Sequence, residues 1–309
     1  MCGIAGVILK TPGAVGKHLV QMLDGCQHRG PDSTGFAIYH ADYAETLICR
    51  IYLGCAGDTP EAAGYAGNVL AIIAEYGGVV LEQSFLREHL RLVLSYAGEV
   101  KALCYAIENG AGVEILSMGH CLEIIKGVGT AHTVDAEYGV SAFHGSHGIG
   151  HVRLATESVV DVSRAHPFWA YGFNDVAIVH NGQITNYHKM KRRLEKRGYQ
   201  FRTDNDSELI AVYLADKLDA GRTLDEVLAE SVSELDGTFS FLVSTRDAIG
   251  FAKDVLAAKP MVVLERDGVI AVASEEVSLQ RLFPGESLAT YEPFPGTYKT
   301  WQTSAELVP

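Results

Sequence analysis

Short apolar runs and amphipathic segments alternate along the chain, and their spacing predicts its secondary structure. Runs of β-branched and aromatic residues bounded by turn residues are typical of strands, whereas apolar positions three and four apart are typical of helices. Strands are predicted at residues 3–9, 36–39, 46–53, 149–155, 176–179, 238–244, 249–253, 261–265, 269–273 and 296–301. Helices are predicted at residues 15–23, 187–197, 206–218 and 224–235. This order indicates an α+β fold in which antiparallel sheets are covered by helices.

The pattern changes between about residues 55 and 146. Two amphipathic helices are predicted there, near residues 85–96 and 100–108, together with a pair of strands at 113–117 and 121–126. We therefore expect an α+β insertion at about 55–146 with a small core of its own. Its early glycines are not followed by Gly-Lys-Ser/Thr or by G-x-G-x-x-G, so they do not predict a phosphate-binding loop.

The composition narrows the class of protein. The 309 residues carry a formal net charge of −13, and no basic face of the kind that nucleic acid requires is visible. The most apolar region, residues 64–81, is interrupted by Asn68, Glu75 and several glycines, so no membrane span is expected. Six scattered cysteines without a CxxC pair fit neither zinc nor iron–sulfur ligation and suggest a reducing compartment, hence a cytoplasmic location.

Cys2 is the first candidate for chemistry. If Met1 is removed, this residue carries both a thiol and a free α-amino group. An α-amine ordinarily titrates at about 7.7–8.0, close to the value of about 8.5 for a cysteine thiol, so the amine can take the thiol proton near neutral pH. An N-terminal amine that serves as base for its own residue is an established way to activate a nucleophile. If Met1 is retained, the base is lost.

Two arginines are candidates for binding an anion. Arg29 opens the Gly- and Pro-containing segment Arg29-Gly30-Pro31-Asp32-Ser33, which is either a plain turn or a loop that folds over a ligand. Arg153 lies within an apolar strand, where an arginine needs a partner. Its planar guanidinium can donate two parallel hydrogen bonds to a ligand carboxylate. A structural ion pair would also explain an arginine at this position.

Two further segments are candidates for donors and a carboxylate. Asn181-Gly182 follows a predicted strand, and its side-chain amide and backbone N–H are the two donors that an oxyanion requires. A simple Asn-Gly turn is the alternative. Asp206 lies at the start of a predicted helix, where it either caps the helix or holds a substrate ammonium.

A metal site is the competing interpretation of His144, His147 and His151, which are spaced H-x2-H-x3-H. No acidic or thiolate ligand accompanies them in a fixed helix, so structural or solvent-facing roles are the preferred interpretation. We expect no metal.

The order of these segments resembles the class II glutamine amidotransferase family. Cys2-Gly3-Ile4, Arg-Gly-Pro-Asp-Ser, Gly-His-x-Arg-x-Ala-Thr, His-Asn-Gly and Asp-Ser-Glu follow one another as they do in that family. Ala165-His166-Pro167-Phe168, Asp236-Gly237-Thr238-Phe239 and Ala273-Ser274-Glu275 add to the match. The resemblance runs from residue 2 to about residue 282 and implies one domain over residues 2–309, interrupted by the insertion.

The resemblance implies an N-terminal nucleophile hydrolase fold, a four-layer αββα sandwich of two antiparallel sheets. It also implies hydrolysis of L-glutamine, with Cys2 as nucleophile and its own amine as proton shuttle. The implied oxyanion donors are Asn181 and Gly182. The implied substrate contacts are Arg153 to the α-carboxylate, Asp206 to the α-ammonium, Thr156 in the same pocket, and Arg29 in a loop that closes on substrate.

Several features depart from the usual family pattern. Leu154 follows the strand arginine where many members have an aromatic residue, Glu157-Ser158 replaces His-Gly after Ala-Thr, and the insertion is long. These features resemble stand-alone amidotransferase subunits of glutamate-synthase-like systems, including N-methylglutamate synthase.

The chain ends about 27 residues after Leu282, so the ammonia is expected to be consumed on another polypeptide through a protected channel in a hetero-oligomer. We expect no cofactor in this chain, and FMN and iron–sulfur clusters on partner subunits. Two alternatives stay open: a free-standing amidohydrolase that acts on another amide, and a catalytically silent scaffold or regulatory subunit.

Overall fold

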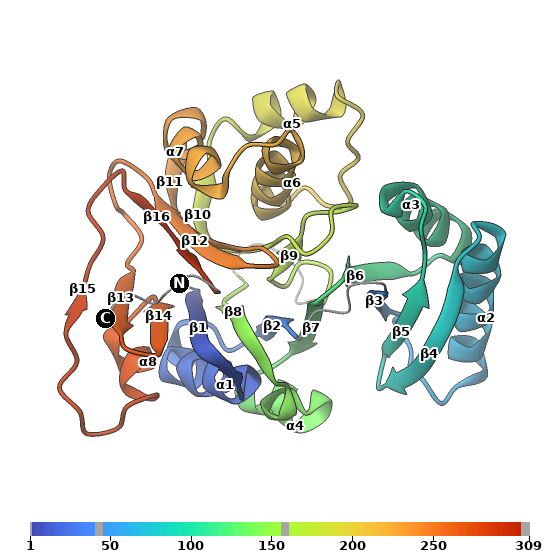
Figure 1. Ribbon diagram of the computed structural model, residues 1–309, viewed down its shortest axis with the longest axis horizontal. Helices are drawn as coiled ribbons and strands as arrows, with labels where there is room; N and C mark the ends of the chain where they lie inside the picture. The colour runs from blue at the N-terminus through green and yellow to red at the C-terminus, as the bar shows by residue number, and fades with distance from the viewer. Residues whose placement is uncertain (1, 41–45, 156–160, 304–309) are drawn as a thin grey trace.

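The computed structural model describes residues 2–40, 46–155 and 161–303. Two antiparallel sheets form the body of the molecule (Figure 1). The seven-stranded sheet has the order β15 (Thr290–Tyr291), β13 (Val262–Arg266), β14 (Val269–Ala273), β1 (Gly3–Gly13), β8 (Gly145–Arg153), β2 (Ser33–Tyr39) and β7 (Leu122–Val128). The five-stranded sheet has the order β16 (Tyr298–Gln302), β12 (Ala248–Lys253), β11 (Gly237–Ser244), β10 (Ala177–Ile184) and β9 (Phe168–Trp169).

Helices cover the outer face of each sheet, which gives the four-layer αββα arrangement (Figure 1). The seven-stranded sheet is covered by α1 (Val15–Gly25), α4 (Ala131–Tyr138) and α8 (Glu276–Gln280). The five-stranded sheet is covered by α6 (Asp206–Asp219) and α7 (Leu224–Glu234), with α5 (Tyr187–Glu195) beside α6. The predicted α+β fold with antiparallel sheets is confirmed.

The two sheets approach closely at Gly6 of β1. A Cβ added to Gly6 would lie 2.8 Å from Cδ1 of Leu242 on β11, which is closer than real side chains come. The space between the sheets is filled by alternate residues of their strands, including Ile4, Ile8, Val179 and Leu242. This packing holds β1, and with it the start of the described chain, in the middle of the molecule.

A third sheet lies at one end of the body (Figure 1), and its buried side chains continue the core between the two main sheets rather than forming the separate core that was predicted. Its strands are β4 (Val79–Leu86), β5 (His89–Ser95), β3 (Leu47–Tyr52) and β6 (Glu114–Gly119), in that order. They are accompanied by α2 (Pro60–Glu75) and α3 (Val100–Ala111). We refer to residues 47–119 as the insertion unit.

The insertion unit differs from the predicted insertion at about 55–146 in both boundaries. It begins earlier, because β3 pairs with β5 and β6, and it ends earlier, because β7 returns to the seven-stranded sheet. The predicted strands at 113–117 and 121–126 exist, but they do not pair with each other. They belong to different sheets, and each strand therefore takes its partner from elsewhere in the chain.

The helix predicted near residues 85–96 is wrong, since this segment forms the end of β4 and all of β5. Leu90, Leu92 and Leu94 are fully buried on one face of β5, and Arg91 between them is partly exposed, as a strand requires. The other predicted helices are confirmed. Three helices were missed, α2, α4 and α8, and the first begins after a Thr59 cap with Pro60 at its first turn. The small residues of α2, which include two glycines, do not predict a helix.

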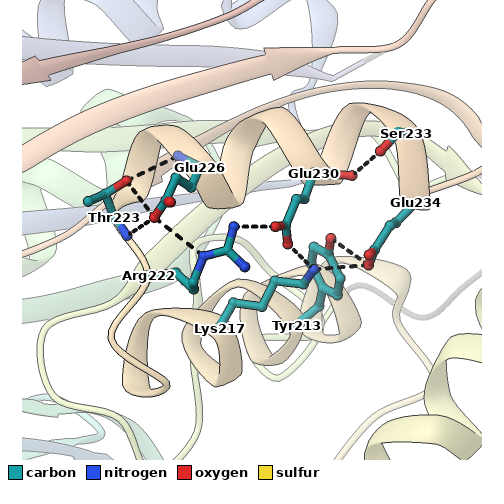
Figure 2. A network of polar contacts seen from close by, with 8 residues as sticks. All are labelled: Tyr213, Lys217, Arg222, Thr223, Glu226, Glu230, Ser233 and Glu234. Atoms are coloured by element: carbon teal, nitrogen blue, oxygen red, sulfur yellow. Dashed lines mark hydrogen bonds and ion pairs between the residues drawn. The ribbon is translucent and has the colours of Figure 1, made fainter.

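Polar contacts on the surface of α6 and α7 hold these two helices together (Figure 2). Lys217 of α6 pairs with Glu230 and Glu234 of α7, and Thr223 caps α7 in a reciprocal contact with Glu226. Arg222 adds ion pairs to Glu226 and Glu230. Exposed pairs of this kind contribute little each, so the buried apolar face of α7 remains the main stabilising element.

One buried carboxylate joins the insertion unit to the body. Glu123 of β7 is 1% exposed and pairs with Arg50 of β3, and it also accepts a hydrogen bond from Nε of Arg91 on β5 at 2.9 Å. Burial opposes its ionisation, but Arg50, His40 and Arg91 together outweigh burial and keep the pKa of Glu123 well below its usual range. No helix in the described part of the chain is long and apolar enough to cross a bilayer.

Replacing Glu123 by Ala leaves Arg50 buried without its charge partner. We expect the free energy of unfolding to fall by about 3–5 kcal/mol, as measured by urea denaturation. The matched control is Glu286→Ala, because Glu286 pairs with Arg266 on the exposed surface and its loss should cost no more than about 1 kcal/mol. Equal effects of the two variants would contradict a structural role for the Glu123 cluster.

Candidate active site

Cys2 lies directly before β1, beside the end of β8. The register Gly3 to Val152 brings Cys2 next to the residues that follow β8. The backbone N–H of Leu154 donates to Sγ of Cys2 at 3.3 Å. Cys2 is neither fully buried nor fully exposed, so its thiol is fixed by the backbone and still has access to a ligand.

Two side chains fix the backbone of Cys2. Its carbonyl oxygen accepts from Nε of Arg29 at 2.9 Å and from Nδ2 of Asn181 at 3.0 Å. Arg29 is buried and also pairs with Glu275, which follows β14. Three segments that are far apart in the sequence therefore converge on the residue that carries the candidate nucleophile.

Asn181 and Gly182 lie inside β10 rather than in a turn after it. The side-chain oxygen of Asn181 lies 3.3 Å from Nε2 of His151. If this nitrogen donates, the amide is oriented with its NH2 group toward Cys2. Gly182 has φ +142°, and a Cβ there would clash with the carbonyl oxygen of Thr238. Glycine is thus required at this position, next to the candidate oxyanion donor.

Buried histidines surround this donor. Burial lowers the pKa of His151 to about 3, so the ring is neutral at physiological pH. Its ring stacks on that of His166 at a centroid distance of 4.1 Å, and Nε2 of His166 lies 2.7 Å from Oγ of Ser207. The described residues contain no group of three or more histidine, cysteine or acidic side chains placed to hold a metal ion.

Asp206 is the first residue of α6, after the Asn205 cap. Burial opposes its charge, but hydrogen bonding to His180 and to the backbone N–H of Ile184 outweighs burial and lowers the pKa of this carboxyl. Asp206 is therefore an anion at neutral pH. It can attract a ligand cation.

Gly182 and Asp206 line an open cleft of about 530 Å³. The other residues around this cleft are Gln183, Ile184, Thr185, Tyr187, His188, Asp204 and Asn205. Cys2 and Arg153 are not in its lining, but Asn181 precedes Gly182 and bonds Cys2 directly. Arg153 ends β8 one residue before Leu154, and its carbonyl oxygen accepts from the N–H of Asp32 at 3.0 Å.

The structure thus gathers most of the predicted site residues. Cys2, Arg29 and Asn181 touch one another through the Cys2 carbonyl, Arg153 adjoins the thiol along β8, and Gly182 and Asp206 share the cleft. Thr156 lies outside the described residues. The Arg29 guanidinium is engaged with Cys2 and Glu275 in this structure; closure of its loop on substrate stays a prediction.

Sequence reasoning gave no role to Ser274, Glu275 or Asp32. Ser274 Oγ accepts from the N–H of Ile4 at 2.9 Å, and Asp32 accepts from the N–H of Ala155 at 2.7 Å. Both residues brace the segments next to Cys2. Ser274 and Glu275 could have been recognised as candidates because they directly follow the apolar strand at 269–273. Their partners, however, depend on the tertiary fold.

The chain is similar in sequence to known proteins over almost its whole length. Residues 151–281 match a family described as a glutamine amidotransferase domain. The chain is 38% identical to a putative glutamine amidotransferase of Methanothermobacter thermautotrophicus, over 95% of this chain and 97% of that protein. It is 36% identical to the glutamine amidotransferase-like protein GlxB of Rhizobium meliloti, over 97% and 98% of the two chains.

A solved structure supports the fold. Glutamine phosphoribosylpyrophosphate amidotransferase from B. subtilis superimposes with a TM-score of 0.61 at 20% identity, over 99% of this chain. The superposition covers 50% of the solved chain, so this chain spans about half of that structure.

The relatives define the chain as a glutamine amidotransferase, built on a fold of two antiparallel sheets covered by helices. The chain belongs to the class II glutamine amidotransferases, a family that takes ammonia from glutamine and gives it to an acceptor.

Buried neutral histidines predict a pH dependence of stability. Burial lowers the pKa of His147 to about 4 and that of His151 to about 3, whereas both titrate near 6.5 when unfolded. The unfolded chain then binds more protons between these values, so stability falls as pH is lowered from about 6.5 to about 4. Each group contributes about 1.4 kcal/mol per pH unit at most.

Urea denaturation at pH 7.5, 6.0 and 5.0 measures this slope. His147→Gln and His151→Gln should each make it shallower, even if they also lower stability at pH 7.5. A wild-type stability that is flat between pH 7 and 5 is the outcome that contradicts neutral burial.

Proposed function

We propose that this chain hydrolyses L-glutamine with the Cys2 thiol as nucleophile and that the ammonia passes to a separate synthase subunit. One observation carries the first half of this proposal. The Asn181 amide and the Leu154 N–H both reach Cys2, at its carbonyl and its sulfur, from different strands.

The chemistry follows from the residue itself once Met1 is removed. The α-amine of Cys2 takes the thiol proton, and the sulfur attacks the side-chain carbonyl carbon of glutamine. The protonated amine then gives its proton to the departing nitrogen, which leaves as ammonia, and a thioester remains. Water, deprotonated by the same amine, hydrolyses the thioester to glutamate and restores the thiol.

The oxyanion of each tetrahedral intermediate requires two donors. The Asn181 amide and the Gly182 N–H are adjacent, and neutral His151 is placed to orient the Asn181 amide. Donors that are already held in place cost no reorganisation when the charge develops.

Glutamine carries one carboxylate and one ammonium at its α-carbon. Arg153 supplies a cation beside Cys2, and Asp206 supplies an anion in the cleft that Gly182 lines. We assign them to the α-carboxylate and the α-ammonium, and we assign Thr156 to substrate binding on the resemblance alone. The pairing selects a free amino acid, which argues against the alternative of an amidohydrolase for another amide.

The acceptor subunit is the finer part of the proposal. Ammonium is no nucleophile, and free ammonia is mostly protonated at neutral pH, so a protected passage to the acceptor is required. Leu154 and Glu157-Ser158 resemble stand-alone subunits of glutamate-synthase-like systems. We therefore propose a cytoplasmic hetero-oligomer with FMN and iron–sulfur clusters on partner subunits, such as N-methylglutamate synthase. Co-purification from the native source, followed by identification of the partner, tests this part.

Cys2→Ala should abolish glutaminase activity, because no other group replaces the thiol, while the melting temperature changes little. Glutamate release and thermal unfolding measure the two effects. Intact-mass analysis after treatment with a glutamine-like diazoketone is the companion experiment. Wild type should lack Met1 and gain one label. An unlabelled chain that retains Met1 would instead support the catalytically silent scaffold.

Asn181→Ala should lower kcat by about 10²–10³-fold, the usual cost of losing one oxyanion donor, with a smaller change in KM. Arg153→Ala is the contrasting variant, since loss of a carboxylate contact should mainly raise the KM for glutamine. Steady-state glutaminase kinetics separate the two. An unchanged kcat for Asn181→Ala contradicts the oxyanion assignment.

A further inference from the structure

The segment that leads to Asp206 packs against the insertion unit. Lys101, Tyr105 and Glu108 of α3 are spaced by four and three residues and thus share one helix face. Nζ of Lys101 lies 4.2 Å from the ring centroid of Tyr199, and Glu108 pairs with Arg202. One face of α3 therefore packs against residues 199–202.

Arg202 makes the polar contacts of this junction. Its Nη1 donates to Oε1 of Glu108 at 2.9 Å and to the carbonyl oxygen of Ile115 at 2.7 Å. Both acceptors belong to the insertion unit, on α3 and β6. The guanidinium also lies over the ring of Tyr171, 4.7 Å from its centroid. A planar group with several donors suits such a site better than an ammonium.

The other end of the segment is fixed on α6. Glu208 is fully buried, and its carboxylate accepts from the backbone N–H groups of Arg202 and Thr203, each at 2.8 Å. Asp206 lies two residues before Glu208, in the first turn of α6. The position of Asp206 is therefore tied to Arg202 through a short, hydrogen-bonded loop.

Close packing alone does not hold the junction. A cleft of about 180 Å³ lies among Tyr105, Glu108, Tyr171 and Arg202. Loss of the Arg202 hydrogen bonds would free the loop to move into this space.

We propose that Arg202 is a positioning residue for glutamine, through which the insertion unit holds Asp206 in place for the substrate α-ammonium. The inference rests on the proposed function, which assigns Asp206 to that group. It gives the insertion unit a role in substrate selection: the free amino group of glutamine is recognised only while α3 and β6 hold the loop.

The experiment uses the full chain and compares glutamine with glutaramate, which has the same amide and chain but no α-amino group. For Arg202→Met we expect the KM for glutamine to rise about tenfold, the factor that corresponds to one charge-assisted hydrogen bond. We expect kcat to stay within about twofold, because Cys2 and Asn181 are untouched. The preference for glutamine over glutaramate, as kcat/KM, should fall by about the same tenfold factor.

Matched variants test whether the contact between Arg202 and Glu108 carries the effect. Glu108→Ala should act in the same direction as Arg202→Met, whereas Glu108→Gln keeps an acceptor and should stay near wild type. Arg197→Met is the control, since Arg197 forms a surface pair with Asp216 at 2.8 Å on the same side of the body. If Arg202→Met does not fold, Arg202→Lys gives the readout, with a smaller shift in the same direction.

Asp206→Ala separates the two proposals. If this variant keeps the preference for glutamine over glutaramate, the assigned role of Asp206 fails, and the inference fails with it. If Asp206→Ala loses the preference and Arg202→Met retains it, only the inference is overturned. Equal losses of activity on both substrates in Arg202→Met, with a lower melting temperature, would show a merely structural role and also overturn it.

Discussion

The carbonyl oxygen of Cys2 is the point on which the site depends. It accepts hydrogen bonds from Arg29 and Asn181, which come from the α1–β2 connection and from the opposite sheet. Two such donors fix the orientation of this carbonyl group. The fixed backbone in turn orients the side chain of Cys2. The central position of β1 between β8 and β14 makes this possible.

Burial keeps several of the titratable side chains around this point uncharged. His147 and His151 are kept neutral by burial, as is His166, whose pKa lies well below its usual value. Neutral rings donate hydrogen bonds and add no cation that would compete with Arg153 for a carboxylate. Asp206 stays ionised because His180 and a backbone N–H support its charge.

The insertion unit is joined to the body by two polar bridges of different kinds. Glu123 is fully buried among Arg50 and Arg91, where the loss of one partner exposes an unpaired charge to a low dielectric. Arg202, in the loop before α6, is partly exposed and pairs with Glu108 of α3 in the insertion unit. The first bridge secures the attachment of the unit, and the second connects it to the substrate cleft.

The sequence by itself determined most of the strands and helices at both ends of the chain and the order of the motifs, because each depends on local periodicity or on residue type. Tertiary structure decided what local pattern leaves open. Residues 85–96 fit both periods, and pairing with β3 and β4 makes β5 a strand. The partners of Glu275, Asp32 and Arg202 lie about 90 to 250 residues away. Such contacts arise from the register of distant strands, which no local window of sequence contains.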